Sequence, residues 1–281
     1  MIDIASIARN LRFLEEEGIW ISKDKSEISY PADGHDNYFK IEERSIWFRH
    51  RNDCIIETFK RFPPGGTVYD IGGGNGHVSC ALKNNGYHTV LVEPGIKGAH
   101  NAKTRGLDPV ICSSLESAGF YEGTMPAIGL FDVLEHIEDD EDFLTKTRTL
   151  LVPNGRLYIT VPAYQTLWSK EDYLAGHYRR YRLKELIDKL KISGYEIDYA
   201  TYFFMLLAIP ILFFRTIPSK LMLYDKKDPL KAGGEYKKRA GITGILLDTY
   251  LRYEISMLRK SYMLFGASCL IVARAKNQFI E

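Results

Sequence analysis

Short apolar runs alternate with amphipathic stretches through the middle of the chain. Apolar segments of this kind, bounded by turn residues, are typical of strands in parallel sheets. Five of them lie at 68–72, 88–93, 108–112, 127–133 and 156–161. The stretches between them predict helices at 77–85, 96–105 and 139–151. Strands that alternate with helices indicate βαβ units, whose right-handed crossovers place ligands at the carboxyl ends of the strands.

Helical patterns flank this region on both sides. We expect helices over 2–18, 43–61, 183–195 and 243–261. The run at 199–214 carries no charge, but it contains Pro210 and is shorter than the roughly 20 apolar residues of a membrane-spanning helix. Residues 215–240, which follow, are basic. Together the two stretches favour a helical lid or a surface that touches lipid-linked substrates; a buried helix with a solvated basic loop is the alternative.

Composition narrows the function classes. Lys plus Arg (37) nearly balances Asp plus Glu (36) in the 281 residues, so no basic field for a nucleic-acid partner is expected. Four scattered cysteines form no CxxC pair, which is typical of a reducing compartment. The first 20 residues carry charges inside their apolar stretch, unlike a signal peptide. We therefore expect a cytoplasmic protein.

A glycine-rich turn joins the strand at 68–72 to the next helix. It reads DIGGGNG, with Asp70 followed by Gly72, Gly74 and Gly76. Glycines there let the backbone approach a ligand that any Cβ would block. A dinucleotide-binding GxGxxG turn would need Gly or Ala where His77 stands, and the leading acid suits a ligand with a cationic amino group. A nicotinamide oxidoreductase and a purely structural turn are the alternatives.

Glu93 ends the next strand, where a carboxylate is able to accept hydrogen bonds from two vicinal ribose hydroxyls. A surface glutamate at a strand end is the alternative. The position of Glu93 after the glycine turn favours the ribose-binding role.

The segments VYDIGGGNG, VLVEP, GLFDVLEHIEDDEDFL and LLVPNGRLYITVPAY resemble the class I S-adenosylmethionine methyltransferases over roughly 68–164. YQTLWSKEDYLAGHYRRY further resembles a subgroup often associated with glycan or lipid biosynthesis. The resemblance implies S-adenosylmethionine as cofactor and S-adenosylhomocysteine as product. It also implies a Rossmann-like, mostly parallel sheet of seven strands with helices on both faces. The last strand, SCLIVAR, would run antiparallel beside a strand near 195–202, after a helical insertion.

The same resemblance assigns cofactor contacts. The acidic residue and the glycine turn would hold the methionyl part, Glu93 the ribose, and the residues after the second and third strands the adenine. Phe131 and Asp132, near the end of the fourth strand, would pass close to the sulfonium. The helix at 43–61 would cap the cofactor, although packing explains Trp47 almost as well. The residues expected at the cofactor are Asp70, Gly72, Gly74, Gly76, Glu93, Pro94, Ser114, Leu115, Phe131, Asp132, Trp47 and Arg49.

Catalytic candidates follow the fourth and fifth strands. His136 would act as a general base or lid residue, or only hydrogen-bond its loop. The segment of His177, Tyr178, Arg179, Arg180 and Tyr181 is the other candidate for a base. Its two arginines would clamp a phosphate or carboxylate of the acceptor, unless the segment is a surface loop that pairs with nearby acids such as Asp172. Asp132, Glu135 and His136 would converge if a metal ion were used, but acids near a helix start are common, and we predict no metal.

We therefore expect a methyltransferase acting on an O or N acceptor that is a small molecule, saccharide-linked or lipid-linked, with peripheral contact at the inner membrane face. An NAD(P)-dependent oxidoreductase or a degenerate, non-catalytic binding protein is the alternative. The predicted division is a helical cap at 1–62, a core at 63–202 and 262–281, and an apolar and basic insertion at 203–261.

Overall fold

A computed structural model describes residues 3–23, 39, 41–221 and 242–276. In these residues one sheet of nine strands has the order β1-β2-β5-β4-β3-β6-β7-β9-β8. The strands are β1 (Leu11–Leu14), β2 (Ile19–Ser22), β3 (Val68–Ile71), β4 (Thr89–Val92), β5 (Val110–Cys112), β6 (Met125–Phe131), β7 (Leu151–Pro162), β8 (Tyr195–Phe203) and β9 (Ser268–Ala275).

The strands from β2 to β7 pair in parallel, as the alternating pattern predicts. β9 lies between β7 and β8 and is antiparallel to both. The prediction of a Rossmann-like sheet with an antiparallel last strand beside 195–202 is therefore confirmed. The predicted number of seven strands is wrong, because the amino-terminal segment adds two.

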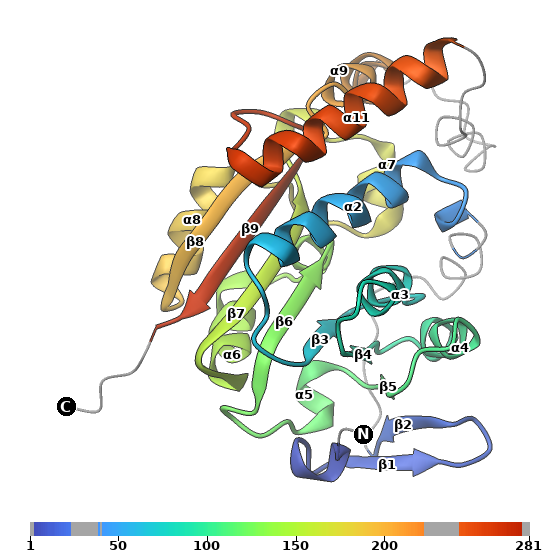
Figure 1. The fold of residues 1–281 in the computed structure, drawn as a ribbon, viewed down its shortest axis with the longest axis vertical. Helices are drawn as coiled ribbons and strands as arrows, with labels where there is room; N and C mark the ends of the chain where they lie inside the picture. Colours follow the sequence, from blue (N-terminus) through green and yellow to red (C-terminus); the bar gives the residue numbers. More distant parts are fainter. Residues whose placement is uncertain (1–2, 24–38, 40, 222–241, 277–281) are drawn as a thin grey trace.

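Helices cover both faces of the sheet. The longer ones are α2 (Ile46–Arg61), α3 (His77–Asn84), α4 (Ile96–Thr104), α6 (Asp140–Leu150), α8 (Leu183–Ile192) and α11 (Ile242–Lys260). One face packs against α6 and α8 through buried residues such as Leu144 and Leu190. The opposite face packs against α2, α3 and α11 through residues such as Phe59, Leu82 and Leu258. Figure 1 shows α2 and α11 side by side over this second face.

Shorter helical turns lie in the connections. They are a 3-10 turn at Ile4–Ser6, α5 (Leu115–Ala118), the 3-10 turns η2 (Leu134–His136) and η3 (Gln165–Leu167), α7 (Lys170–Ala175), α9 (Ala208–Ile211), the π-helical turn η4 (Leu212–Thr216) and α10 (Ile217–Lys220). Four of them, α5, η2, η3 and α7, follow the carboxyl ends of the parallel strands β5, β6 and β7, and α9, η4 and α10 follow the end of β8. They surround the edge of the sheet at which ligands bind in this fold.

The predicted helix over 2–18 is wrong, because β1 and β2 form a hairpin there. Two short apolar runs flank three glutamates and Gly18, which adopts a left-handed φ of 63°. This arrangement is a hairpin signal that the helical spacing of the first apolar residues obscured. Ile19 is fully buried, and β2 pairs in parallel with β5, where Trp20 lies opposite Ile111.

The uncharged run at 199–214 is divided between two structures. Residues 199–203 complete β8, and helical structure begins only at Ala208, so a helix over the whole run is wrong. No helix in the described ranges is long and apolar enough to cross a membrane. Residues 222–241 of the predicted basic segment lie outside the described residues. The division into cap, core and insertion stays a prediction.

Candidate active site

The glycine turn after β3 forms one wall of the site. Gly72, Gly74 and Gly76 have positive φ angles of 69°, 54° and 77°. A Cβ at Gly76 would lie 2.5 Å from Leu107 Cδ1, so this glycine allows α3 to pack closely. A Cβ at Gly74 would meet nothing within 4 Å. Gly74 thus borders open space, as a backbone that receives a ligand must.

Two buried carboxyl groups flank this turn. Glu93 accepts hydrogen bonds from the backbone N–H groups of Gly74 at 2.8 Å and Gly95 at 2.7 Å. Burial nevertheless raises the pKa of Glu93 to about 7. Asp70 accepts a hydrogen bond from Ser79 at 2.6 Å, and burial raises its pKa to about 6. Its Oδ1 is buried with no hydrogen-bond partner in the described structure, so it has the capacity to bind a donor from a ligand.

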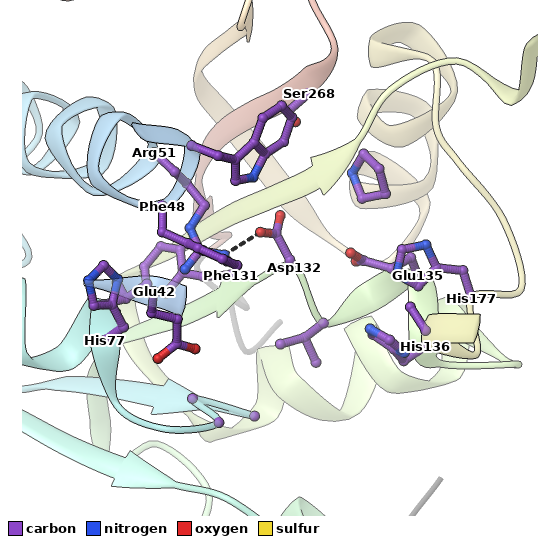
Figure 2. A pocket seen from close by; sticks show the side chains of 18 of the residues that line it. Glu42, Phe48, Arg51, His77, Phe131, Asp132, Glu135, His136, His177 and Ser268 are labelled. Carbon is purple, nitrogen blue, oxygen red and sulfur yellow. Dashed lines mark hydrogen bonds and ion pairs between the residues drawn. The ribbon is translucent and has the colours of Figure 1, made fainter. Parts of the chain in front are cut away.

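A cavity of about 370 Å³ extends from these acids across the carboxyl end of the sheet. Its volume is typical of small-molecule sites. Figure 2 shows that side chains from α2, the end of β6, η2 and the loop after α7 surround it. Further lining residues, Ile211 and Arg215, come from the segment after β8, and Ser268 comes from the start of β9.

Most of the predicted site residues line this cavity. They are Trp47, Asp70, Gly72, Gly74, Glu93, Pro94, Phe131, Asp132, His136 and His177. Six others do not: Arg49, Gly76, Ser114, Leu115, Tyr178 and Arg179. Their parts in binding or catalysis have no support from this geometry.

Arg49 lies on the exposed side of α2 because of the helical period. α2 turns Trp47, Phe48 and Arg51 to the cavity, whereas Arg49 is exposed. Arg51 forms an ion pair with Asp132, with Nη1 and Oδ2 2.5 Å apart. Sequence reasoning missed Arg51, although the spacing of four residues from Trp47 was a usable signal.

The residues predicted at the adenine edge have other contacts. The Ser114 hydroxyl accepts a hydrogen bond from the backbone N–H of Ser117 at 3.1 Å and so caps α5. Leu115 is 8% exposed and belongs to the hydrophobic core.

Arg179 and Arg180, the two arginines of the predicted phosphate or carboxylate clamp, are both paired with acidic residues of the protein. Arg179 forms an ion pair with Asp140 at 2.9 Å and donates to the carbonyl oxygen of Glu138, outside the cavity. Arg180 lines the cavity, but its two hydrogen bonds to Asp172, at 2.8 and 2.9 Å, hold it in place. Because both guanidinium groups are paired within the protein, the predicted phosphate clamp at Arg179 has no support.

A cluster of three titratable side chains lines the cavity. η2 carries Glu135 and His136, and His177 follows α7. Burial, and then the nearby charge of Asp132, raise the pKa of Glu135 well above its ordinary value. Burial, and then the neighbouring His177, lower the pKa of His136 to about 4. The two imidazole rings meet edge to face, with centroids 4.7 Å apart.

Comparisons with known proteins agree with this architecture. Residues 47–200, more than half of the chain, match the family described as "Methyltransferase domain". A ubiquinone biosynthesis O-methyltransferase of Schizosaccharomyces pombe is 33% identical over 119 residues, which cover 39% of this chain and 43% of that protein. The chain thus spans less than half the length of this curated relative.

Solved structures show the same fold at low identity. A chain from the Haloferax volcanii complex of the Trm112 methyltransferase activator with a methyltransferase is 15% identical, with a TM-score of 0.57 over 89% of this chain and 99% of that one. Phosphoethanolamine N-methyltransferase 2 of Haemonchus contortus, solved with S-adenosylmethionine, is 15% identical, with a TM-score of 0.54 over 89% of this chain and 59% of that one.

Two observations indicate that the site fits S-adenosylmethionine, the cofactor bound in the Haemonchus contortus structure. The space beside Gly74 is open to a ligand, and the orphaned Asp70 oxygen lies next to it in the same wall of the cavity. Glu93, which directly follows the adjacent strand β4, offers a carboxylate to hydroxyl donors of a ligand. The chain therefore belongs to the family of methyltransferase domains, and this domain is an S-adenosylmethionine-dependent methyltransferase.

Proposed function

We propose that the protein methylates an oxygen atom of a small acceptor with a large apolar portion, such as a lipid-linked molecule, while it contacts a membrane surface. The name of the Schizosaccharomyces pombe relative supports oxygen as the methylated atom. The observation that carries the proposal is a cluster of exposed apolar side chains beside the cavity.

We call this cluster the apolar collar. Its large hydrophobic side chains are each at least 37% exposed and lie between the end of β8 and the middle of α11. They are Leu206, Ile209, Phe213, Phe214, Ile217, Leu221, Ile245, Leu246 and Tyr253. Contiguous exposed apolar surfaces are rare on proteins without a partner, and they mark contacts with proteins or membranes.

The collar adjoins the cavity through the segment that carries both. Ile211 and Arg215 line the cavity, while Ile209, Phe213 and Phe214 on the same turns face outward. Figure 1 draws α9 and α11 at the same end of the molecule. The backbone N–H of Met205, just before α9, donates a hydrogen bond to Glu254 of α11. An acceptor anchored in lipid by an apolar chain would therefore reach the cavity from the surface that touches the membrane.

On the cofactor side, Glu93 would accept hydrogen bonds from the ribose hydroxyls, and Asp70 with the glycine turn would hold the methionyl part. Pro94 would border the adenine, and Phe131 would lie near the sulfonium. When bound, the cofactor supplies an activated methyl group. The acceptor oxygen forms a bond to the methyl carbon, the carbon–sulfur bond breaks with its electron pair left on sulfur, and the hydroxyl proton passes to solvent.

Vesicle flotation tests the membrane contact. We expect vesicles of phosphatidylcholine and phosphatidylglycerol to retain the wild-type protein, and the double variant Phe213→Ser/Phe214→Ser to lose at least half of this retention. Phe13→Ser is the matched control, because Phe13 is 46% exposed in the distant hairpin. Calorimetry with S-adenosylhomocysteine should give the same affinity for all three proteins, in the micromolar range. Equal retention of the collar variant and the wild type would refute the membrane contact and leave the methyltransferase assignment intact.

A further inference from the structure

We propose that Glu135, His136 and His177 together bind one divalent transition-metal ion at the acceptor end of the cavity. Each residue offers a ligand atom, and the three atoms lie within 4.8 Å of one another. Figure 2 shows the three side chains next to one another, drawn from η2 and from the loop after α7. Two imidazoles and one carboxylate on one side of an ion form a common site for divalent first-row metals and leave positions open for other ligands.

The Glu135 carboxylate gives the first independent support. Its side chain is 1% exposed, and its Oε2 has no hydrogen-bond partner among the described residues. A buried carboxylate oxygen without a donor or a cation is costly, so such an atom usually marks a site for a group that compensates it. The oxygen belongs to a residue that lines the cavity, where an ion has access.

His177 gives the second support, because one of its ring nitrogens is already fixed. Its Nδ1 lies 2.9 Å from Asp172 Oδ1. Asp172 is in turn held by Arg180 and by the backbone N–H of Ser169 at 2.8 Å. A carboxylate that orients the far nitrogen of a histidine is the usual second layer of a metal site.

The backbone of Gly176 plays a similar part for His136. A hydrogen bond links this imidazole to Gly176, the residue before His177. The turn that ends α7 therefore positions both histidines at once. The sequence pattern grouped Glu135 and His136 with Asp132, whose side chain pairs with Arg51 in the structure, and not with His177.

The ion would complete the proposed oxygen methylation, on which its role rests. A bound cation draws electron density from a hydroxyl group and lowers its pKa. The acceptor would then lose its proton to water before its oxygen bonds to the methyl carbon. A histidine nitrogen that ligates an ion has donated its lone pair to that ion and is unable to accept a proton. His136 and His177 would therefore be metal ligands and not general bases.

Cobalt titration of the full chain tests the site without any acceptor. After treatment with EDTA and dialysis, Co²⁺ should bind the wild type at one ion per chain, with a visible absorption band from the nitrogen and oxygen ligands. Glu135→Gln and His177→Ala should weaken this binding at least about 100-fold. Asp172→Asn, which removes only the orienting carboxylate, should weaken it by about 10–100-fold.

His100→Ala is the matched control, because His100 is exposed and pairs with Glu17 far from the cavity. It should bind Co²⁺ like the wild type. S-adenosylhomocysteine binding by every variant reports whether the domain is folded. A wild type without the absorption band, or one that binds Co²⁺ no better than both Glu135→Gln and His177→Ala, overturns the metal site. Failure of the wild type to bind S-adenosylhomocysteine would instead overturn the cofactor site on which the proposed function depends.

Discussion

Glu93 illustrates how a single buried carboxyl group links stability to ligand binding. Burial raises its pKa to about 7, and the neighbouring Asp70 adds to this effect. Between the ordinary value of 4.5 and about 7, the folded protein binds more protons at this site than the unfolded chain does. The contribution of Glu93 to stability is therefore greatest below pH 4.5 and is lost as the pH rises toward 7. A ligand that donates hydrogen bonds to the ionised carboxylate compensates for that loss.

We predict that S-adenosylhomocysteine binds about tenfold more weakly at pH 6 than at pH 8, because at pH 6 most of the free protein must first lose the Glu93 proton. Calorimetry across this range measures the effect. Glu93→Gln should bind weakly at both pH values and remove most of the pH dependence. An affinity that is constant from pH 6 to pH 8 in the wild type would contradict the ribose-binding role.

Gly74 and Gly76 are two residues apart, yet the structure assigns them different tasks. We predict that Gly74→Ala folds with a loss of about 1–2 kcal/mol, owing to its left-handed backbone, but binds S-adenosylhomocysteine at least tenfold more weakly. Gly76→Ala should lose more stability, since its Cβ would lie 2.5 Å from Leu107. Urea denaturation and calorimetry separate the two effects. If Gly74→Ala bound the ligand normally, the open space beside it would not be the cofactor site.

At the scale of elements, α2 joins three parts of the molecule. It packs on the sheet through Phe59, lines the cavity through Trp47 and contacts α11. The contact with α11 includes a buried pair, in which His50 Nε2 lies 2.6 Å from Glu254 Oε2 with exposures of 2% and 0%. The other oxygen of Glu254 accepts a hydrogen bond from the backbone N–H of Met205. The collar is thus fastened to the core by polar contacts as well as by packing.

Glu254→Ala should reduce the free energy of unfolding by about 3–5 kcal/mol, because it removes one partner of a buried hydrogen-bonded pair. Glu196→Ala is the matched control. Its carboxylate is exposed and lies 3.6 Å from Arg274, so its removal should cost at most about 1 kcal/mol. Urea denaturation measures both variants. Similar losses for the two would show that the buried pair does not hold α11 on α2.

Local sequence patterns predicted most helices and strands correctly. They failed where contacts between segments far apart in the sequence determine the structure. The strands and helices from 68 to 162 lie close to their predicted positions, because each apolar run matches its own burial. The amino-terminal hairpin differs, since Ile19 gains its burial only from the neighbourhood of β5 and α4, about 80 residues later. Likewise, residues 199–203 extend β8 because β9 pairs with them from beyond the insertion.

The whole site combines residues that no local pattern connects. The glycine turn and Glu93 were recognisable because their spacing along the chain is short. Arg51, which pairs with Asp132, was not, because these partners meet only after the chain has folded. Arg180 was recognisable as part of the predicted acceptor segment, but its ion pair with Asp172 was only the alternative to that role. A sequence indicates which residue types are available, but whether an arginine faces a ligand or a neighbouring acid depends on three-dimensional neighbours that periodicity does not encode.

The distribution of the cavity wall also predicts how ligand binding spreads through the molecule. Lining residues come from α2, from the carboxyl ends of the central parallel strands and from the segment after β8, whereas the hairpin of β1 and β2 contributes none.

At a concentration of 100 times its Kd, S-adenosylhomocysteine stabilises the folded state by about 2.7 kcal/mol. Amide hydrogens of β3 and β6, which exchange through global unfolding, should then exchange about 100-fold more slowly. Within the sheet the hairpin pairs with β5 at two positions, Trp20 with Ile111 and Ile21 with Cys112, and we expect it to open before the cavity unfolds. We therefore expect hydrogen exchange of residues 11–22 to change by less than twofold, as measured by mass spectrometry with and without the ligand. Equal protection of the hairpin and of β3 would show that the sheet unfolds as one unit and that the hairpin does not open independently.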